Sequence, residues 1–425
     1  MVNSTKKSRS ILLIVLCWFF YSVSYLCKVN YAANITGIID FYGVTKAQAG
    51  LPSTLFFFAY GVGQVFNGIL CKKYNIKWVV FSSIIISSAI NLVVALTTNF
   101  TVVTWLWMIN GFSLSLLWPT IIRLLSESLP QSEIVRSGAI MGTSIPIGTL
   151  LVYGLSSVFA AFDNFKLAFY SAAVAAILIA VAWMIAYKKA VKIAVEEKEC
   201  ELCETEYRAI NLERKQQTSY EKKIFYVTVC ILCLCAIGSN MTKDGITTWL
   251  PKMLQEEYAV SDSLSILLTV LLPIVALFSN FLAIAVHKKI SDYVTESALL
   301  FGVIFILVGF VLGSLTLKSI VGMLGGLIAV TFVASSINNL MTVLFPMFMR
   351  DKVDSGLFAG ILNGFCYVGS TISSYGFGAI ADNFGWTSVF YTLLGTCVFV
   401  FALWIMYSVI KRVGKNGQSP DLFWE

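Results

Sequence analysis

Apolar runs of about 20 residues follow one another along almost the whole chain, separated by short polar connections. Twelve such runs are present, near residues 11–33, 50–71, 78–97, 101–125, 137–161, 165–187, 223–250, 263–286, 297–317, 319–347, 355–380 and 386–410. A helix of about 20 residues spans a hydrocarbon core roughly 30 Å thick. The pattern therefore predicts an all-α polytopic membrane protein with twelve transmembrane helices.

The composition excludes an ordinary soluble domain. Of the 425 residues, 58% are hydrophobic and only 12% are charged, and the mean hydropathy is +0.81. The first apolar run is longer than the 7 to 15 residues of a cleaved signal core, so we expect it to remain as a helix. The motifs of a phosphate-binding loop, a nucleophile elbow or a metal cluster are absent from the sequence. We therefore expect no enzyme, no metal site and no cofactor.

Positive charge is concentrated on alternate connections between the apolar runs. Of the 30 lysines and arginines, 24 lie before the first run, after the last, or in every second connection. Lysine and arginine accumulate on the cytoplasmic side of membrane proteins. The asymmetry predicts a plasma-membrane protein with both termini in the cytoplasm. It also accounts for the net charge of +7, which therefore does not indicate a nucleic-acid partner.

The apolar rhythm is interrupted once, by a mixed-charge stretch at residues 188–222. We interpret this stretch as a cytoplasmic linker between an N-terminal six-helix bundle (1–187) and a C-terminal six-helix bundle (223–425). The two halves share short motifs at similar spacing: Ser137-Gly138 with Ser355-Gly356, and Asp163-Asn164-Phe165 with Asp382-Asn383-Phe384. Two parallel six-helix repeats resemble the plan of the major facilitator superfamily. That resemblance implies a substrate site near the membrane midplane, between the halves.

Lys28 lies inside the first apolar run and has no acidic neighbour in the sequence. At helical spacing it shares one face with Tyr21, Tyr25 and Tyr31. A charged side chain in a membrane helix costs about 2.5 to 3.5 kcal/mol on insertion scales, so it is seldom kept without a use. The simpler alternative is a lysine whose long stem reaches the membrane surface. We predict that Lys28 binds an anionic substrate.

Lys243 repeats the arrangement in the second half, 215 positions further on, with Asn240 and Thr247 on its face. Asp244 follows directly, but neighbouring residues on a helix point about 100° apart. Asp244 is therefore not expected to share the face of Lys243. It either neutralises a lysine across the interface or belongs to polar structure near the outer end.

The expected mode of transport, exchange or symport, depends on the role of Asp244. A cavity that is positive when empty resists closing until an anion is bound, which favours exchange of one anion for another. If Asp244 neutralises the cavity, the empty carrier can reorient, and symport or uniport becomes possible. Buried chains of acids and histidines that would carry protons are not evident in the sequence, so proton coupling is the weaker alternative.

Two uncharged polar stripes are further candidates for substrate contact. At helical spacing, one face carries Tyr60, Gln64 and Asn67, and another carries Asn363, Tyr367, Ser370 and Ser374. Such residues orient substrate hydroxyls, or they hydrogen-bond neighbouring helices to each other. From these stripes and the surroundings of the lysines, the candidate contacts besides Lys28 and Lys243 are Tyr25, Asn30, Tyr60, Gln64, Asn240 and Tyr367.

Several motifs resemble one branch of the superfamily, the organophosphate:phosphate antiporters, which includes glycerol-3-phosphate and hexose-phosphate exchangers. The residues that carry this resemblance are Tyr25, Lys28, Asn30, Asn75, Trp105, Asn110, Gly111, Trp118, Pro119, Arg123, Lys243, Trp249 and Pro251. In that branch arginine stands at both lysine positions and holds phosphate through a planar fork. Lysine keeps the attraction and loses the fork, and the histidine of the fifth helix is missing from Thr143–Gly148.

These observations predict a secondary active transporter that moves a small organic anion, a phosphorylated or carboxylated metabolite, across the lipid bilayer by alternating access. The expected mode is exchange, with inorganic phosphate as a possible counter-substrate, by a protein acting as a monomer. The alternative within transport is a carboxylate symporter. The alternative outside transport is a transporter-like membrane sensor, which binds its metabolite without moving it across the membrane.

Overall fold

The structure is a computed structural model that describes residues 10–70, 74–205, 219–345 and 355–415. Parts of two sequence motifs lie outside the described residues: positions 71–73 after the second apolar run and positions 206–218 of the mixed-charge stretch. In the first half the helices are α1 (Ile11–Ala33), α2 (Ile35–Tyr42), α3 (Lys46–Leu70), α4 (Ile76–Leu96), α5 (Phe100–Ser115), α6 (Leu117–Ser128), α7 (Gln131–Ala160) and α8 (Lys166–Thr205).

The second half begins with a helix of 40 residues, as long as α8. Its elements are α9 (Ser219–Tyr258), α10 (Asp262–Thr269), α11 (Leu271–Ala276), α12 (Ser279–Ile290), α13 (Tyr293–Thr316), α14 (Ile320–Asn339), the π-helix η2 (Leu340–Leu344), α16 (Ser355–Phe384) and α17 (Trp386–Lys415). The boundary of the two halves at residues 187 and 223 stays a prediction.

These elements form twelve membrane-length segments, as the sequence predicts. Three segments are composite: α5 with α6, α10 with α11 and α12, and α14 with η2. Ten segments within the described residues are both long and strongly apolar. The other two, α3 and α16, are 25 and 30 residues long but carry the polar stripes around Gln64 and Ser370. They are the two helices whose polar faces meet between the halves, so a fully apolar surface is not required of them.

Prolines account for part of the segmentation. Pro119 stands in the first turn of α6 and Pro273 in the first turn of α11, positions where the missing N–H is not needed for an intrahelical bond. The fourth apolar run is consequently broken at Leu116 into α5 and α6.

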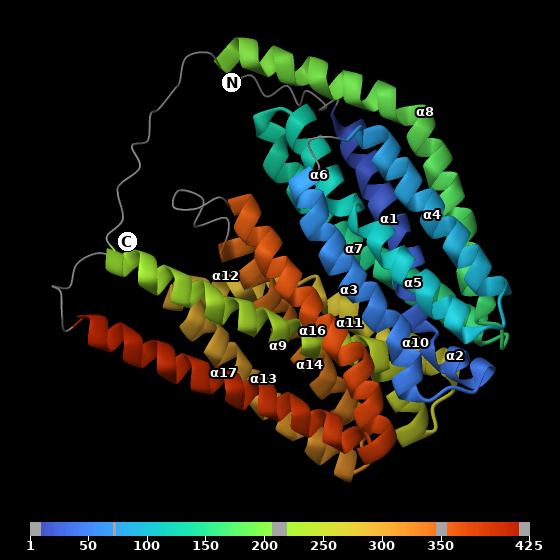
Figure 1. The fold of residues 1–425 in the computed structure, drawn as a ribbon, viewed down its shortest axis with the longest axis vertical. Helices are drawn as coiled ribbons and strands as arrows, with labels where there is room; N and C mark the ends of the chain where they lie inside the picture. The colour runs from blue at the N-terminus through green and yellow to red at the C-terminus, as the bar shows by residue number, and fades with distance from the viewer. Residues whose placement is uncertain (1–9, 71–73, 206–218, 346–354, 416–425) are drawn as a thin grey trace, which may run out of the picture.

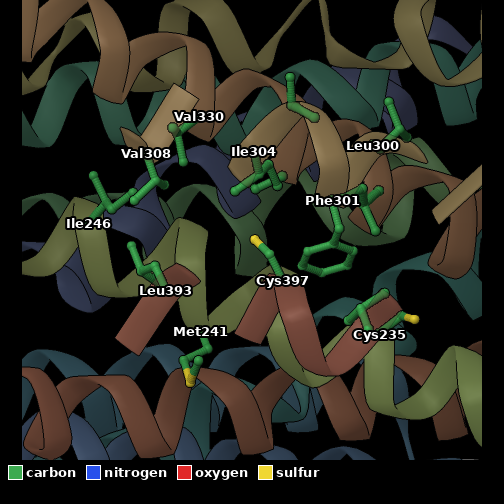
Figure 2. Packing of buried hydrophobic residues seen from close by; sticks show 14 of the residues in the cluster. Cys235, Met241, Ile246, Leu300, Phe301, Ile304, Val308, Val330, Leu393 and Cys397 are labelled. Atoms are coloured by element: carbon green, nitrogen blue, oxygen red, sulfur yellow. The ribbon is translucent and has the colours of Figure 1, made fainter. Parts of the chain in front are cut away.

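Each half has its own apolar core. One cluster of buried side chains gathers residues of α1, α3–α8, and the other gathers residues of α9, α13, α14, α16 and α17. Figure 2 shows part of this cluster, where Ile246 of α9 lies near Leu393 of α17 and Val308 of α13, and Phe301 of α13 lies near Cys397 of α17. Packing also crosses between the halves, because Ile35 and Ile39 of α2 belong to the second cluster.

The halves meet at one end of the molecule. In Figure 1 the bundles approach each other near α2 and α10 and diverge toward the end where α1 begins and α17 ends. We call these ends the α2 face and the terminal face. The α3 and α16 helices run side by side between the halves, and their contact is close: a Cβ added to Gly50 would lie 2.1 Å from the Ser374 carbonyl oxygen.

Candidate functional site

Lys28 projects from α1 into a group of tyrosine rings. Its Nζ lies 4.0 Å from the centroid of the Tyr60 ring, 5.2 Å from that of Tyr25 and 5.5 Å from that of Tyr367. Tyr60 and Tyr367 also contact each other, with centroids 4.7 Å apart. No described carboxylate lies within ion-pair distance of the ammonium. Lys28 is therefore stabilised by the faces of aromatic rings, which attract a cation without neutralising it.

The rings around Lys28 come from both halves. Tyr25 lies on α1 and Tyr60 on α3, whereas Tyr367 lies on α16. Close packing fixes them: a Cβ at Gly61 would lie 3.2 Å from the Tyr367 Cβ, and a Cβ at Gly148 of α7 would lie 2.8 Å from the Tyr25 Cβ. We call Tyr25, Tyr60 and Tyr367 the tyrosine cage. Because the cage spans α1, α3 and α16, its geometry depends on how the halves are placed.

Lys243 on α9 forms an ion pair with Asp244, with Nζ 3.3 Å from Oδ1. The other carboxylate oxygen, Oδ2, accepts a hydrogen bond from the Ser370 hydroxyl on α16. Both ion-pair partners keep some solvent contact, with 28% and 22% of their side chains exposed. Neighbouring residues on a helix do not share a face, yet these two side chains are long enough to meet, so Asp244 pairs with the lysine next to it.

The two charged groups are linked through α16. Tyr367 of the cage and Ser370, the hydrogen-bond donor to Asp244, lie three residues apart and thus on one face of that helix. The structure therefore gathers two ammonium groups, one carboxylate and the tyrosine cage around the same segment of α16.

Asn30 and Asn240, two of the predicted substrate contacts, make hydrogen bonds within their own bundles. Asn30 is 1% exposed, and its Nδ2 donates to Asn91 Oδ1 of α4 at 2.7 Å, inside the first bundle. Residues two apart on a helix point to opposite sides, so Asn30 cannot share the face of Lys28. Asn240 is 3% exposed and donates to the carbonyl of Ala236 in its own helix. We leave Asn30 out of the proposed binding residues.

The two polar stripes meet each other. Asn363 of α16 donates to Gln64 Oε1 of α3 at 2.8 Å, one turn from the contact between Tyr60 and Tyr367. Asn67, the third member of the α3 stripe, donates instead to the Leu116 carbonyl within the first bundle. Each stripe therefore includes helix-to-helix hydrogen bonds as well as a ring of the tyrosine cage.

An ion-pair cluster at the α2 face was not foreseen from the sequence. The ammonium of Lys46 lies 3.1 Å from Glu256 and 3.4 Å from Asp382, and the backbone N–H groups of Lys46 and Ala47 both donate to Asp382. Trp386 Nε1 donates to Glu256 at 2.8 Å. The cluster joins α3 of one half to α9 and α16 of the other. Its only sequence signal is the repeated Asp-Asn-Phe motif that contains Asp382.

The cage geometry makes a testable prediction about Tyr60. Tyr60→Phe retains the ring face under the ammonium, whereas Tyr60→Leu removes it. A cation–π contact contributes roughly 0.5 to 2 kcal/mol. We expect Tyr60→Leu to weaken anion binding by about 3- to 30-fold, because Lys28 is no longer held in place, and Tyr60→Phe to change it by less than about threefold. Calorimetric titration checks this, and equal affinities for the two variants would contradict it.

A polytopic α-helical protein with cationic groups held between two helical bundles has the architecture of a membrane transporter. The sequence model of the Major Facilitator Superfamily matches residues 17–353, and the chain belongs to that family. The predicted family and fold are thereby confirmed, and the family and fold are those of transporters rather than enzymes. A crystal structure of a bacterial homologue of the lysosomal transporter Spinster, inward-facing and occupied, superimposes with a TM-score of 0.73 at 12% identity, covering 96% of this chain and 98% of that one.

Curated relatives agree with this class. The hexuronate transporter of Bacillus subtilis is 24% identical over 96% of this chain and 97% of its own length. The membrane sensor protein UhpC of Escherichia coli is 26% identical over 34% of this chain, and a probable hexose phosphate transport protein of Chlamydia muridarum is 24% identical over 33%. These last two matches span about a third of each relative, 32% and 31% of its length.

Proposed function

We propose that the protein moves a small organic anion across the plasma membrane by alternating access, and that Lys28 is the main attraction for the substrate. The carrying observation is an ammonium inside a membrane-spanning helix, surrounded by three tyrosine rings, with no described carboxylate near it. An ammonium inside a membrane-spanning helix costs free energy, so such a residue is seldom retained without a function. Lys243 is the second cationic contact, and Tyr25, Tyr60 and Tyr367 supply hydroxyls for a hydroxylated substrate.

The proposed orientation places the terminal face in the cytoplasm. Arg123, Arg136, Lys288 and Lys411 lie toward that face, on the side where most lysines and arginines of the sequence fall, whereas the α2 face carries fewer, among them Lys46 and Lys252. This distribution follows the positive-inside tendency. With that orientation, the ion-pair cluster around Lys46 closes the outer side, and we propose that the structure is the inward-facing state.

Anion exchange is the proposed mode of coupling. Without substrate, the tyrosine cage holds an ammonium that no carboxylate in the described part of the chain neutralises, and enclosing it away from water is unfavourable. A bound anion removes that cost, so the loaded carrier reorients faster than the empty one. Inorganic phosphate or a second organic anion is the proposed counter-substrate.

Proteoliposomes test this mode. We expect uptake of radiolabelled glucuronate or glucose 6-phosphate to be at least about tenfold faster into vesicles loaded with unlabelled anion than into empty vesicles, a difference of about 1.4 kcal/mol in barrier height. Vesicles without the protein are the control. Equal rates into loaded and empty vesicles would contradict exchange.

Two further modes have observations in their favour. The ion pair between Lys243 and Asp244 lowers the positive charge of the empty site, which favours symport or uniport of a carboxylate. Uptake into empty vesicles at the loaded rate is the result that this mode predicts. The similarity to a membrane sensor favours a protein that binds without transporting, and saturable binding without flux is its signature.

A further inference from the structure

We propose that Asp244 sets the charge of the substrate, so that the site prefers anions with one negative charge, such as monocarboxylate sugar acids, over doubly charged phosphate esters. This inference rests on the proposed function and adds a residue that determines specificity. It follows from two observations: Asp244 and Lys243 are paired with each other, whereas Lys28 contacts aromatic rings.

Asp244 is held by two partners that occupy both of its oxygens. Oδ1 pairs with Lys243 at 3.3 Å, and Oδ2 accepts the hydrogen bond of Ser370, whose side chain is fully buried. The partners come from different helices, α9 and α16. The carboxylate is thus held beside one ammonium by an ion pair and by a hydrogen bond from a second helix.

Lys28 has no such partner among the residues that the structure describes. The nearest groups described around its Nζ are the three rings of the tyrosine cage, at 4.0 to 5.5 Å from their centroids. The carboxylate oxygens of Asp244 are engaged elsewhere, by Lys243 and Ser370. The rings stabilise the cation and leave its charge in place.

The charge balance of the site follows directly. Two ammonium groups, Lys28 and Lys243, and one carboxylate, Asp244, leave one positive charge. A monocarboxylate brings the site to neutrality. A phosphate monoester above neutral pH carries close to two negative charges and leaves one in excess, beside the Asp244 carboxylate. Like charges at close range in a partly desolvated site repel each other strongly, so Asp244 discriminates against the dianion.

The test compares two hexose derivatives that differ in charge, glucuronate and glucose 6-phosphate, by calorimetric titration of the purified full-length protein at pH 7.5. We expect the wild type to bind glucuronate at least about tenfold more tightly. Asp244→Asn removes the negative charge with little change in shape. It should shift the ratio of the two affinities at least about tenfold toward glucose 6-phosphate.

Asp40→Asn is the matched control. Asp40 lies on α2 at the α2 face, with 57% of its side chain exposed and Lys252 as its partner at 3.6 Å, so its removal should leave the ratio unchanged. An unchanged ratio in Asp244→Asn, or tighter binding of glucose 6-phosphate by the wild type, would overturn the inference while leaving anion transport intact. Binding of neither anion by the wild type would overturn the proposed function as well. The wild-type preference remains a test if Asp244→Asn does not fold.

Discussion

Replacement of Lys28 by alanine should weaken anion binding by at least about 30-fold, with the protein still folded. Removing one partner of a desolvated charge pair costs roughly 2 to 5 kcal/mol, and every 1.4 kcal/mol is a factor of ten in affinity. The loss should be larger than for any single member of the tyrosine cage, because a tyrosine hydroxyl adds at most a neutral hydrogen bond, whereas Lys28 supplies the charge that attracts the anion. Calorimetric titration with glucuronate, alongside the melting temperature, measures both quantities.

Lys318→Ala is the matched control for this change. Lys318 lies in the turn before α14, is 66% exposed and pairs with Glu257, so the variant removes the same charge away from the site. Its affinity should equal that of the wild type. Lys28→Arg should retain binding, because it keeps the positive charge within the cage. Wild-type affinity in Lys28→Ala would remove Lys28 from the proposed site.

Substitution of Gly50 by leucine should lower transport at least about tenfold while leaving anion binding measurable. A Cβ at this position of α3 would lie 2.1 Å from the Ser374 carbonyl oxygen and 3.0 Å from the Tyr375 Cα. Both are backbone atoms of α16 and cannot rotate away. Overpacking costs roughly 1 to 3 kcal/mol, so the halves should no longer close fully at the α2 face. A carrier that cannot reach this state cannot complete its cycle.

Gly364→Leu on α16 is the control for the leucine substitution. A Cβ added to Gly364 meets no atom within 4 Å, so a side chain there has open space. Exchange flux in proteoliposomes, compared at equal amounts of folded protein, should be near the wild-type value for this control. Full flux in Gly50→Leu would mean that the tight contact of α3 with α16 is not needed for transport.

Most of the fold could be predicted from the sequence, because each membrane helix is determined by its own run of residues. The length of an apolar run is matched to the thickness of the bilayer, and this requirement holds for each run independently of its neighbours. Lys28 and Lys243 were also recognisable locally, since a charge within such a run conflicts with its surroundings. The breaks at Leu116 and Val270 lie just before Pro119 and Pro273.

Most partners of the charged groups lie far from them in the sequence, so they could not be predicted from it. The rings on Lys28 include Tyr60 of α3 and Tyr367 of α16, and their contact with the ammonium depends on how two bundles pack. Helical spacing put Asp244 about 100° from Lys243, but spacing describes Cβ directions and not the reach of a lysine stem. Lys46 and Asp382, which join the halves at the α2 face, are separated by 336 positions. No periodic pattern connects residues at that distance.

We propose above all that an anion binds within the tyrosine cage at the ammonium of Lys28, which pairs with no carboxylate among the described residues. The most direct measurement is an experimental structure of the protein with glucuronate bound. The account predicts the carboxylate of the ligand about 2.7 to 2.9 Å from Lys28 Nζ, the distance of a charge-assisted hydrogen bond, with Tyr60 and Tyr367 still around it. A ligand seated elsewhere, with Lys28 contacting only protein or lipid, would contradict it.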